Sequence, residues 1–262
     1  MRRLTLYAHL IKGNLLNDIQ YRGWPIMILQ VLVVVVTDPL GTILMFSRFG
    51  SIGEWSVARI LLIYALAVTA FGLSESLCRG LDYFPFRTLR SGDFDRMLLR
   101  PASLTVQAAG NVFHIHRFSR VFSGLIAIAW CLRALNITMG AREWAILLLT
   151  LMGGFLFYSG IFLLTCAISF FTIEAMDWIY ILTNVSYQTT RCPPEFMPRT
   201  LRGVFTFLLP ILLISYYPAC TLCRWGEAPW KGLLALPIGA AFACGALLLW
   251  RFGVRHYKST GS

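Results

Sequence analysis

The sequence predicts an all-α, polytopic membrane protein with six transmembrane helices. The chain of 262 residues is 57% hydrophobic and only 13% charged, whereas soluble domains are closer to half apolar and a quarter charged. Its apolar residues gather in runs of about 20 or more, the length that crosses a bilayer as a helix. Lysines and arginines concentrate in alternate connections between these runs, as they do on the cytoplasmic side of membrane proteins.

Residues 1–22 are expected to form a helix that lies on the membrane surface. Leu4, Ala8, Ile11, Leu15 and Ile19 recur at helical spacing, and polar residues lie between them. This amphipathic pattern is typical of a helix in the plane of the membrane interface.

Five apolar segments are long enough to span the membrane. They cover residues 24–46, 57–77, 118–139, 144–171 and 232–252. Basic residues crowd the N-terminal segment, the loop 78–117 and the C-terminal tail, whereas few follow the first and third spans. The positive-inside rule therefore places both termini and the long loop in the cytoplasm.

Two cytoplasmic ends require an even number of crossings, and two arrangements supply the sixth. In one, 203–223 spans the membrane and 174–190 lies on the cytoplasmic interface, which fits the charge bias better. In the other, 174–190 is a short span, and 203–223 is a hairpin that re-enters from outside and breaks near Pro210. Five prolines within 193–218 slightly favour the second arrangement: Pro193, Pro194, Pro198, Pro210 and Pro218.

The last span carries Ala235, Gly239 and Ala243 at four-residue spacing. Small residues at this spacing allow two membrane helices to approach closely. We expect this stripe to pack within the chain rather than between subunits.

The sequence contains no constellation typical of an enzyme. The phosphate-binding pattern G-x-x-x-x-G-K-[ST] does not occur, no histidine lies in a predicted span, and Cys220 and Cys223 form a single CxxC pair without a second one. We therefore expect no catalytic, metal or cofactor-binding residue in this chain. The net charge of +11 belongs to loops beside the spans, where it orients the protein and meets anionic lipid, so no nucleic-acid partner is expected.

A substrate path has weak candidates. Asp38 lies in the outer part of the first span, and Phe155, Tyr158 and Phe162 crowd the fourth. Charges inside a membrane often mark a path, and aromatic faces can bind cations. Asp38 could equally cap a broken helix, and packed or lipid-facing aromatic side chains are commoner than a binding cavity.

The segment GDFDRMLLRP at 92–101 predicts a short amphipathic helix in the basic cytoplasmic loop. Asp93 can cap its start, Phe94, Met97 and Leu98 share one face, and Pro101 disfavours its continuation. Spacing alone leaves two alternatives open: a turn that anchors the loop, or a helix that receives force from a soluble partner.

Three segments carry a resemblance to a known family. SGDFDRMLLRP at 91–101 looks like the G-x-x-D-x-x-L-x-R-P loop of ABC-2 type exporter permeases, in their small bacterial branch. PPEFMPRTLRGVFTFLLPILLISYYPACTL at 193–222 is similar to the proline-punctuated segment of that branch, and WRFGVRHYKSTG at 250–261 resembles its C-terminal ending. With the plan of spans, the likeness covers nearly the whole chain.

The resemblance implies that residues 1–262 form one permease domain of an ABC exporter in the bacterial plasma (inner) membrane. Its partners would be two copies of a separate ATPase subunit, which binds ATP and Mg, and a second permease that is either identical or a sister chain. It implies that a cytoplasmic coupling helix meets the ATPase through Asp93, Phe94, Asp95, Met97, Leu98, Arg100 and Pro101. The segment 191–230 would hold an outer gate with Pro210, Tyr216, Tyr217 and Pro218.

Such systems usually export small or amphiphilic compounds, including drug-like and cationic ones, but no residue here fixes the substrate. Two other classes stay open. An ion-coupled secondary transporter would work without ATP, although the predicted spans hold little midplane charge. A non-transporting membrane scaffold would need no ATPase partner.

Overall fold

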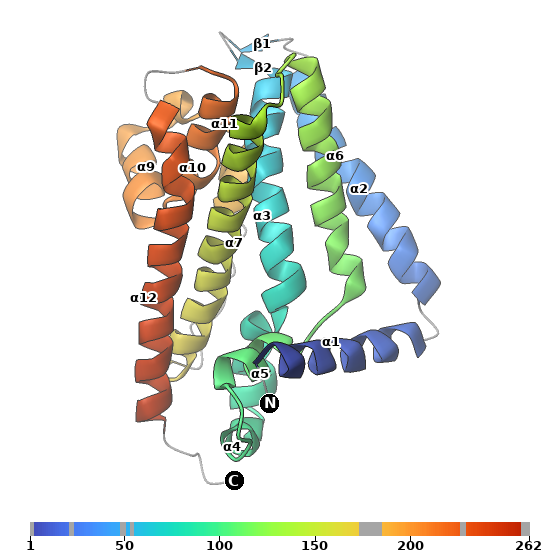
Figure 1. Cartoon of the computed structure of the whole chain (residues 1–262), viewed down its shortest axis with the longest axis vertical. Helices are drawn as coiled ribbons and strands as arrows, with labels where there is room; N and C mark the ends of the chain where they lie inside the picture. Colours follow the sequence, from blue (N-terminus) through green and yellow to red (C-terminus); the bar gives the residue numbers. More distant parts are fainter. Residues whose placement is uncertain are drawn as a thin grey trace.

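The computed structural model describes residues 3–20, 24–47, 51–52, 55–172, 185–225 and 229–257. Long helices form a bundle, and one helix lies across its lower end (Figure 1). The principal helices are α1 (Arg3–Gln20), α2 (Trp24–Ser47), α3 (Val57–Phe84), α4 (Asp93–Leu98), α5 (Leu104–Gly110), α6 (Phe118–Ala134), α7 (Ala141–Ser169), α9 (Arg199–Gly203), α10 (Ile211–Ile214), α11 (Tyr216–Leu222) and α12 (Ala235–His256). Two strands of two residues each, β1 (Ser51–Ile52) and β2 (Trp55–Ser56), pair antiparallel before α3.

Short helical turns connect several of these helices. Five-residue π-helical turns cover Pro85–Leu89, after α3, and Val204–Leu208, after α9. Tighter 3₁₀ turns cover Ile115–Arg117, Pro194–Phe196 and Pro229–Leu234. The turns at Pro85–Leu89 and Ile115–Arg117 therefore frame the loop that carries α4 and α5.

The all-α membrane class agrees with the structure, whereas the expected number of six spans is not confirmed. Four helical segments of the described ranges are long and apolar enough to cross a membrane: Val57–Leu89, Ile115–Ala134, Ala141–Ser169 and Trp230–His256. A fifth is present if the bent pair Arg199–Leu208 and Ile211–Leu222 is one span. The apolar stretch of α2, Pro25–Thr37, is shorter. The predicted element 174–190 falls mostly on residues 173–184, outside the described residues.

Two helix boundaries differ from the expected ones. Helix α3 continues past residue 77 to Phe84, because Arg79 pairs with Glu75 at 3.5 Å and with Asp82 at 3.1 Å. Charges that looked like the start of a loop are therefore paired along one helix. Helix α6 ends at Ala134 instead of 139, and Asn136 then adopts a left-handed φ of 51°, which reverses the chain toward α7.

The core lies around α3. Its residues from Ile60 to Phe71 are buried on every side, as expected of a helix that is apolar all round. Helix α3 packs against α6 and α7, and α7 packs in turn along α12. This places α3 in the middle of the bundle, where it touches elements at both ends.

The small-residue stripe of the last span packs within the chain, as predicted. A Cβ atom on Gly239 of α12 would lie 2.0 Å from the carbonyl oxygen of Gly153 on α7. The same contact is seen from the other side, where a Cβ on Gly153 would lie 2.3 Å from the carbonyl oxygen of Ala235. The two helix backbones therefore touch.

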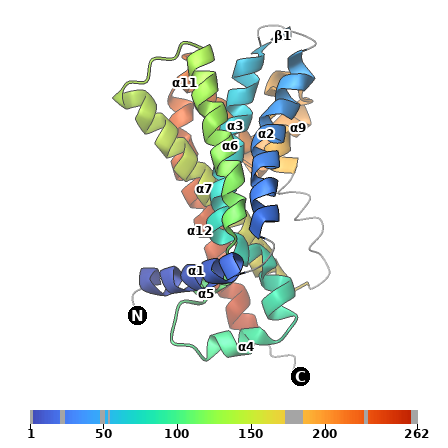
Figure 2. The same cartoon turned by 90° about the vertical axis from the view of Figure 1, so that its right-hand side faces the viewer.

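The bundle has two distinct ends. Helix α1 crosses one end, here called the α1 end, at a steep angle to the spans and beside α4 and α5, and the last turn of α12 lies at this end (Figures 1 and 2). The segment 1–22, expected to lie on the membrane surface, contains helix α1. Its Tyr7 hydroxyl donates to the carbonyl of Leu77, and the Asn14 amide donates to the carbonyl of Gly110 at 3.0 Å. The opposite end, here called the hairpin end, carries β1, β2 and α9–α11 (Figure 1).

Candidate functional site

The predicted coupling segment forms α4, a six-residue helix at the α1 end. Gly92 precedes it with a left-handed φ of 76°, a conformation that favours glycine. Gly92 is therefore the capping residue, and Asp93 is the first residue of the helix instead of its cap. Asp93 accepts a hydrogen bond from the Ser91 hydroxyl at 2.9 Å and pairs with Arg96 at 3.3 Å.

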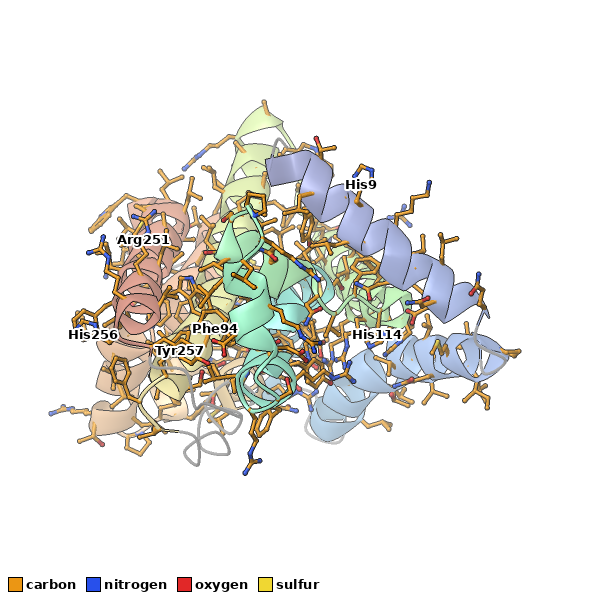
Figure 3. The ribbon with its side chains drawn as sticks, turned by 90° about the horizontal axis from the view of Figure 1, so that it is seen from below. His9, Phe94, His114, Arg251, His256 and Tyr257 are labelled. Atoms are coloured by element: carbon orange, nitrogen blue, oxygen red, sulfur yellow. The ribbon has the colours of Figure 1, made fainter. Side chains whose placement is uncertain are left out.

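One side chain anchors α4 to three spans. Phe94 is fully buried, and its ring centroid lies 5.4 Å from that of Phe84, 5.3 Å from that of Phe170 and 4.8 Å from that of Tyr257. Phe84 is the last residue of α3, and Phe170 and Tyr257 directly follow α7 and α12. Figure 3 shows Phe94 beside Tyr257. Aromatic pairs at such edge-on and tilted angles add to the apolar burial. We call these four residues the aromatic anchor.

The last residue of α4 and the residues that follow it point away from the core. Leu98 is 45% exposed and Leu99 is 85% exposed, and Arg100 and Pro101 follow them at the surface. The expected common face of Phe94, Met97 and Leu98 is therefore split, because the aromatic anchor turns Phe94 and Met97 inward and leaves Leu98 outside. Leu98, Leu99, Arg100 and Pro101 are the exposed part of the predicted coupling segment, and they are called the contact surface below.

A cavity of about 290 Å³ lies beside this surface, between α4, α5 and α1. Met97, Arg100 and Pro101 line it from the α4 side, and Leu6 and Leu10 line it from α1. Asp95, the last of the predicted coupling residues, is half-buried in the first turn of α4.

The predicted gate residues gather at the hairpin end. Pro210 stands at the break between the two halves of the bent pair, whose axes differ by 65°. Tyr216 donates from its hydroxyl to Glu195 Oε1 at 3.2 Å, and Trp55 donates from its indole nitrogen to Glu195 Oε2. Tyr217 lies under Lys231, whose Nζ is 5.2 Å from the ring centroid, and Pro218 is buried within α11.

Aromatic packing extends this group. The Trp55 ring centroid lies 5.9 Å from that of Tyr216 and 4.4 Å from that of Trp225. Arg59, in the first turn of α3, stands over the Trp225 ring at 4.9 Å. Trp55, Glu195, Tyr216 and Trp225 are called the hairpin-end cluster below, and they connect the start of α3 to α11.

Comparison with known families decides the class of protein. A family model described as ABC-2 family transporter protein matches residues 32–261. The chain belongs to the ABC-2 transporter family. It is an ABC-2 type permease, a multi-pass membrane protein whose family works with an ABC ATPase. No curated protein and no solved structure matches the chain.

The permease also contains an ionic cluster that the sequence analysis missed. Glu75 on α3 is 3% exposed and pairs with Arg79 of its own helix. It also pairs with Arg117, in the turn before α6, and with Arg120, in the first turn of α6. Arg117 also donates to the Tyr83 hydroxyl at 3.2 Å. The spacing of four residues between Glu75 and Arg79 indicates one pair, but nothing in the sequence indicates that Arg117 and Arg120 contact Glu75 from another helix.

The weak candidates for a substrate path lie mostly in packed surroundings. Tyr158 and Phe162 of the permease are buried against Phe71, with ring centroids 5.3 and 6.2 Å away. Phe155 is half-buried, and its carbonyl accepts a hydrogen bond from the Ser74 hydroxyl at 2.8 Å. Asp38 belongs to α2, but its side chain is outside the described residues. Tyr158 and Phe162 thus belong to the core around Phe71.

Proposed function

We propose that this permease is the transmembrane subunit of an ATP-driven exporter. Two copies of a separate ATPase, which would bind ATP and Mg, power it from the cytoplasm. Two permeases, either identical or sister chains, enclose the path. The cargo is a small or amphiphilic compound, with drug-like and cationic molecules as the classes to screen first. Family membership supports the permease role, and the geometry of α3 and α4 supports the coupling.

The observation that carries the proposal is the reach of α3. Its last residue, Phe84, belongs to the aromatic anchor under α4. At its other end, Trp55 precedes α3 and belongs to the hairpin-end cluster, and Arg59 in the first turn stands over Trp225 of that cluster. A helix of 28 residues is about 42 Å long. One continuous, buried helix thus joins the contact surface at one end to the predicted gate at the other.

In this mechanism, closure of the ATPase dimer on ATP moves α4. Because Phe94 is packed between Phe84, Phe170 and Tyr257, α4 cannot shift without moving the ends of α3, α7 and α12. The ATPase binds the outward-open permease better than the inward-open one, and this difference in affinity drives the change. The hairpin of α9–α11 re-enters from the outside and separates from Trp55 as the path opens.

The charge at the α1 end supports a cytoplasmic position for α4. Arg251, Arg255 and His256 lie toward the end of α12 that approaches α4 (Figure 3). Arg87, Arg90, Arg96 and Arg100 lie in the loop around α4. Basic residues next to membrane spans favour the cytoplasmic side, where ATP is available to a partner.

The contact surface is tested by the double variant Leu98→Asp, Leu99→Asp in the complex purified from membranes. These side chains are exposed, so the fold should survive while two apolar contacts become charges. We expect the ATPase subunit to be lost from pull-downs. Leu16→Asp is the matched control, since Leu16 is 48% exposed on α1 at the same end of the bundle and is not part of the contact surface. Unchanged co-purification and ATPase activity of the double variant would disprove the coupling role.

The energy source and direction need a separate experiment. Once a resistance screen has found a cargo, the complex is placed in inverted vesicles, where export appears as uptake. Uptake that requires ATP hydrolysis is expected. Uptake that persists without ATP and collapses with an ionophore would instead indicate an ion-coupled carrier.

A further inference from the structure

The cavity between α1, α4 and α5 shares its rim with the contact surface. Arg100 and Pro101 belong to the contact surface, and they also line this cavity of about 290 Å³. Helix α4 lies farther from the spans than α1 does (Figures 1 and 2). A soluble protein that covers the contact surface therefore meets the rim of the cavity as well.

The wall of the cavity is mainly apolar. Leu6 and Leu10 line it from α1, and Met97 and Ala102 line it from α4 and the residues after α4. Its volume lies at the lower limit of the sites that hold drug-sized ligands, which begin at about 300 Å³. Burial of an apolar group in such a place is favourable. The cavity therefore suits an apolar side chain and not a whole transported compound.

Hydrogen bonds hold the wall in place without any partner. The Asn14 amide of α1 donates to the carbonyl of Gly110, the last residue of α5, at 3.0 Å. The Gln107 amide of α5 donates to the Ala102 carbonyl at 3.2 Å. Because α1 and the residues after α4 are both tied to α5, the cavity exists before a partner arrives. A preformed site loses little conformational entropy on binding.

The rim carries a positive charge that lacks a counter-charge within the described part of the chain. Arg96 pairs with Asp93 at 3.3 Å. Arg100 is exposed, and its guanidinium makes no hydrogen bond or ion pair with the described residues. A guanidinium favours a carboxylate partner, which it can bind through two parallel hydrogen bonds. Charge complementarity thus favours a partner that presents an acidic residue beside an apolar one.

We propose that the ATPase subunit inserts an apolar side chain into this cavity and places a carboxylate against Arg100. Leu6 and Leu10 then contact the ATPase directly, so α1 belongs to the same interface as α4 and moves with it. This inference rests on the proposed coupling to an ATPase, and it adds α1 and the chemistry of the partner surface to that coupling.

The first test measures protection of single thiols by the ATPase. Ser103→Cys lies in the cavity wall, Leu99→Cys lies on the contact surface, and Leu16→Cys is the control on the exposed side of α1. Each is introduced into the full-length chain with its seven native cysteines replaced. The permease is placed in nanodiscs, and the rate of labelling by a water-soluble maleimide is measured with and without the ATPase.

We expect all three thiols to react in the permease alone. An ATPase concentration of about ten times its dissociation constant leaves about one-tenth of the permease unbound, so labelling of Ser103→Cys and Leu99→Cys should slow about tenfold. Leu16→Cys should keep its rate. Protection of Leu99→Cys without Ser103→Cys would overturn the inference and leave ATPase docking on α4 intact. Protection of neither would contradict the proposed coupling itself.

Another occupant of the cavity would also be detected by this experiment. A Ser103→Cys thiol that does not react in the permease alone would mean that a lipid chain or another part of the permease fills the cavity. That result would overturn insertion by the ATPase.

The second test keeps the native cysteines and measures the affinity of the ATPase for permease variants. Ala102→Phe fills part of the cavity, and Arg100→Gln removes the charge at its rim. Each should weaken binding about tenfold, as is common for central contacts of an interface, and Arg100→Gln should also make binding less sensitive to salt. Leu16→Phe is the control for added bulk at the same end. Wild-type affinity of Ala102→Phe would overturn insertion, and wild-type affinity of Arg100→Gln would overturn the carboxylate contact.

Discussion

At the scale of single residues, Phe94 and Leu98 show how one short helix can serve two purposes. They are four positions apart and look equivalent in the sequence, but Phe94 is fully buried and Leu98 is 45% exposed. The difference comes from Phe84, Phe170 and Tyr257, which are far apart in the chain and meet only in the folded protein. The pattern of residues 92–101 could predict a helix, whereas only tertiary packing determines which apolar side chain remains available to a partner.

The first prediction concerns the anchor. Phe94→Ala should destabilise the permease by about 3–5 kcal/mol, because it removes a buried ring and leaves a cavity. A lower midpoint of thermal unfolding in purified protein would show this. Leu99→Ala is the control, since Leu99 is 85% exposed, and its midpoint should match wild type. A Phe94→Ala variant as stable as wild type would mean that Phe94 does not anchor α4.

The second prediction concerns the ionic cluster. Glu75→Gln leaves the guanidinium groups of Arg117 and Arg120 without their counter-charge in a buried place, which should cost about 3–5 kcal/mol of stability. Arg224→Gln is the matched comparison, because Arg224 pairs with Glu143 at 3.3 Å but is 74% exposed. Its loss should cost at most about 1 kcal/mol. Thermal unfolding of both variants at equal salt makes the comparison, and equal losses would contradict it.

At the scale of elements, apolar runs predicted α7 and α12, and small-residue spacing predicted that α12 packs closely within the chain, without indicating α7 as its partner. They could not predict where α3 ends, because paired charges at Glu75, Arg79 and Asp82 extend it beyond its apolar part. Proline positions correctly predicted a break at Pro210, which the structure shows as a 65° bend. The partners of Glu75 on the α6 side depend on how two helices cross, and sequence spacing does not contain that information.

The third prediction concerns the contact between α7 and α12. The Cβ atom introduced by Gly239→Ala would lie 2.0 Å from the carbonyl oxygen of Gly153, so α12 and α7 must move apart. Overpacking of this kind costs about 1–3 kcal/mol. Gly245→Ala is the control on the same helix, because a Cβ there meets nothing within 4 Å. Size-exclusion profiles and unfolding midpoints in detergent should be altered for Gly239→Ala alone, and equal behaviour would refute the close contact.

At the scale of the whole molecule, the permease places its contact surface and its predicted gate at opposite ends and joins them by one buried helix. The aromatic anchor fixes α4 to α3, α7 and α12, and the hairpin-end cluster fixes the start of α3 to α11. Hydropathy and the family resemblance predicted the coupling segment at 92–101 and the gate segment at 191–230. The connection between them could not be predicted, because Trp55, Glu195 and Tyr216 come from three separate segments.

The most direct measurement of this connection is the labelling rate of a thiol at the predicted gate. Tyr217→Cys is introduced into a chain whose seven native cysteines are replaced, and the complex with its ATPase is labelled from the hairpin end with and without ATP. The account predicts that ATP changes the labelling rate, and that Leu98→Asp, Leu99→Asp on α4 abolishes this change. A rate that ignores ATP in the otherwise unaltered complex, or an ATP response that survives the α4 variant, would contradict coupling through α4 and α3.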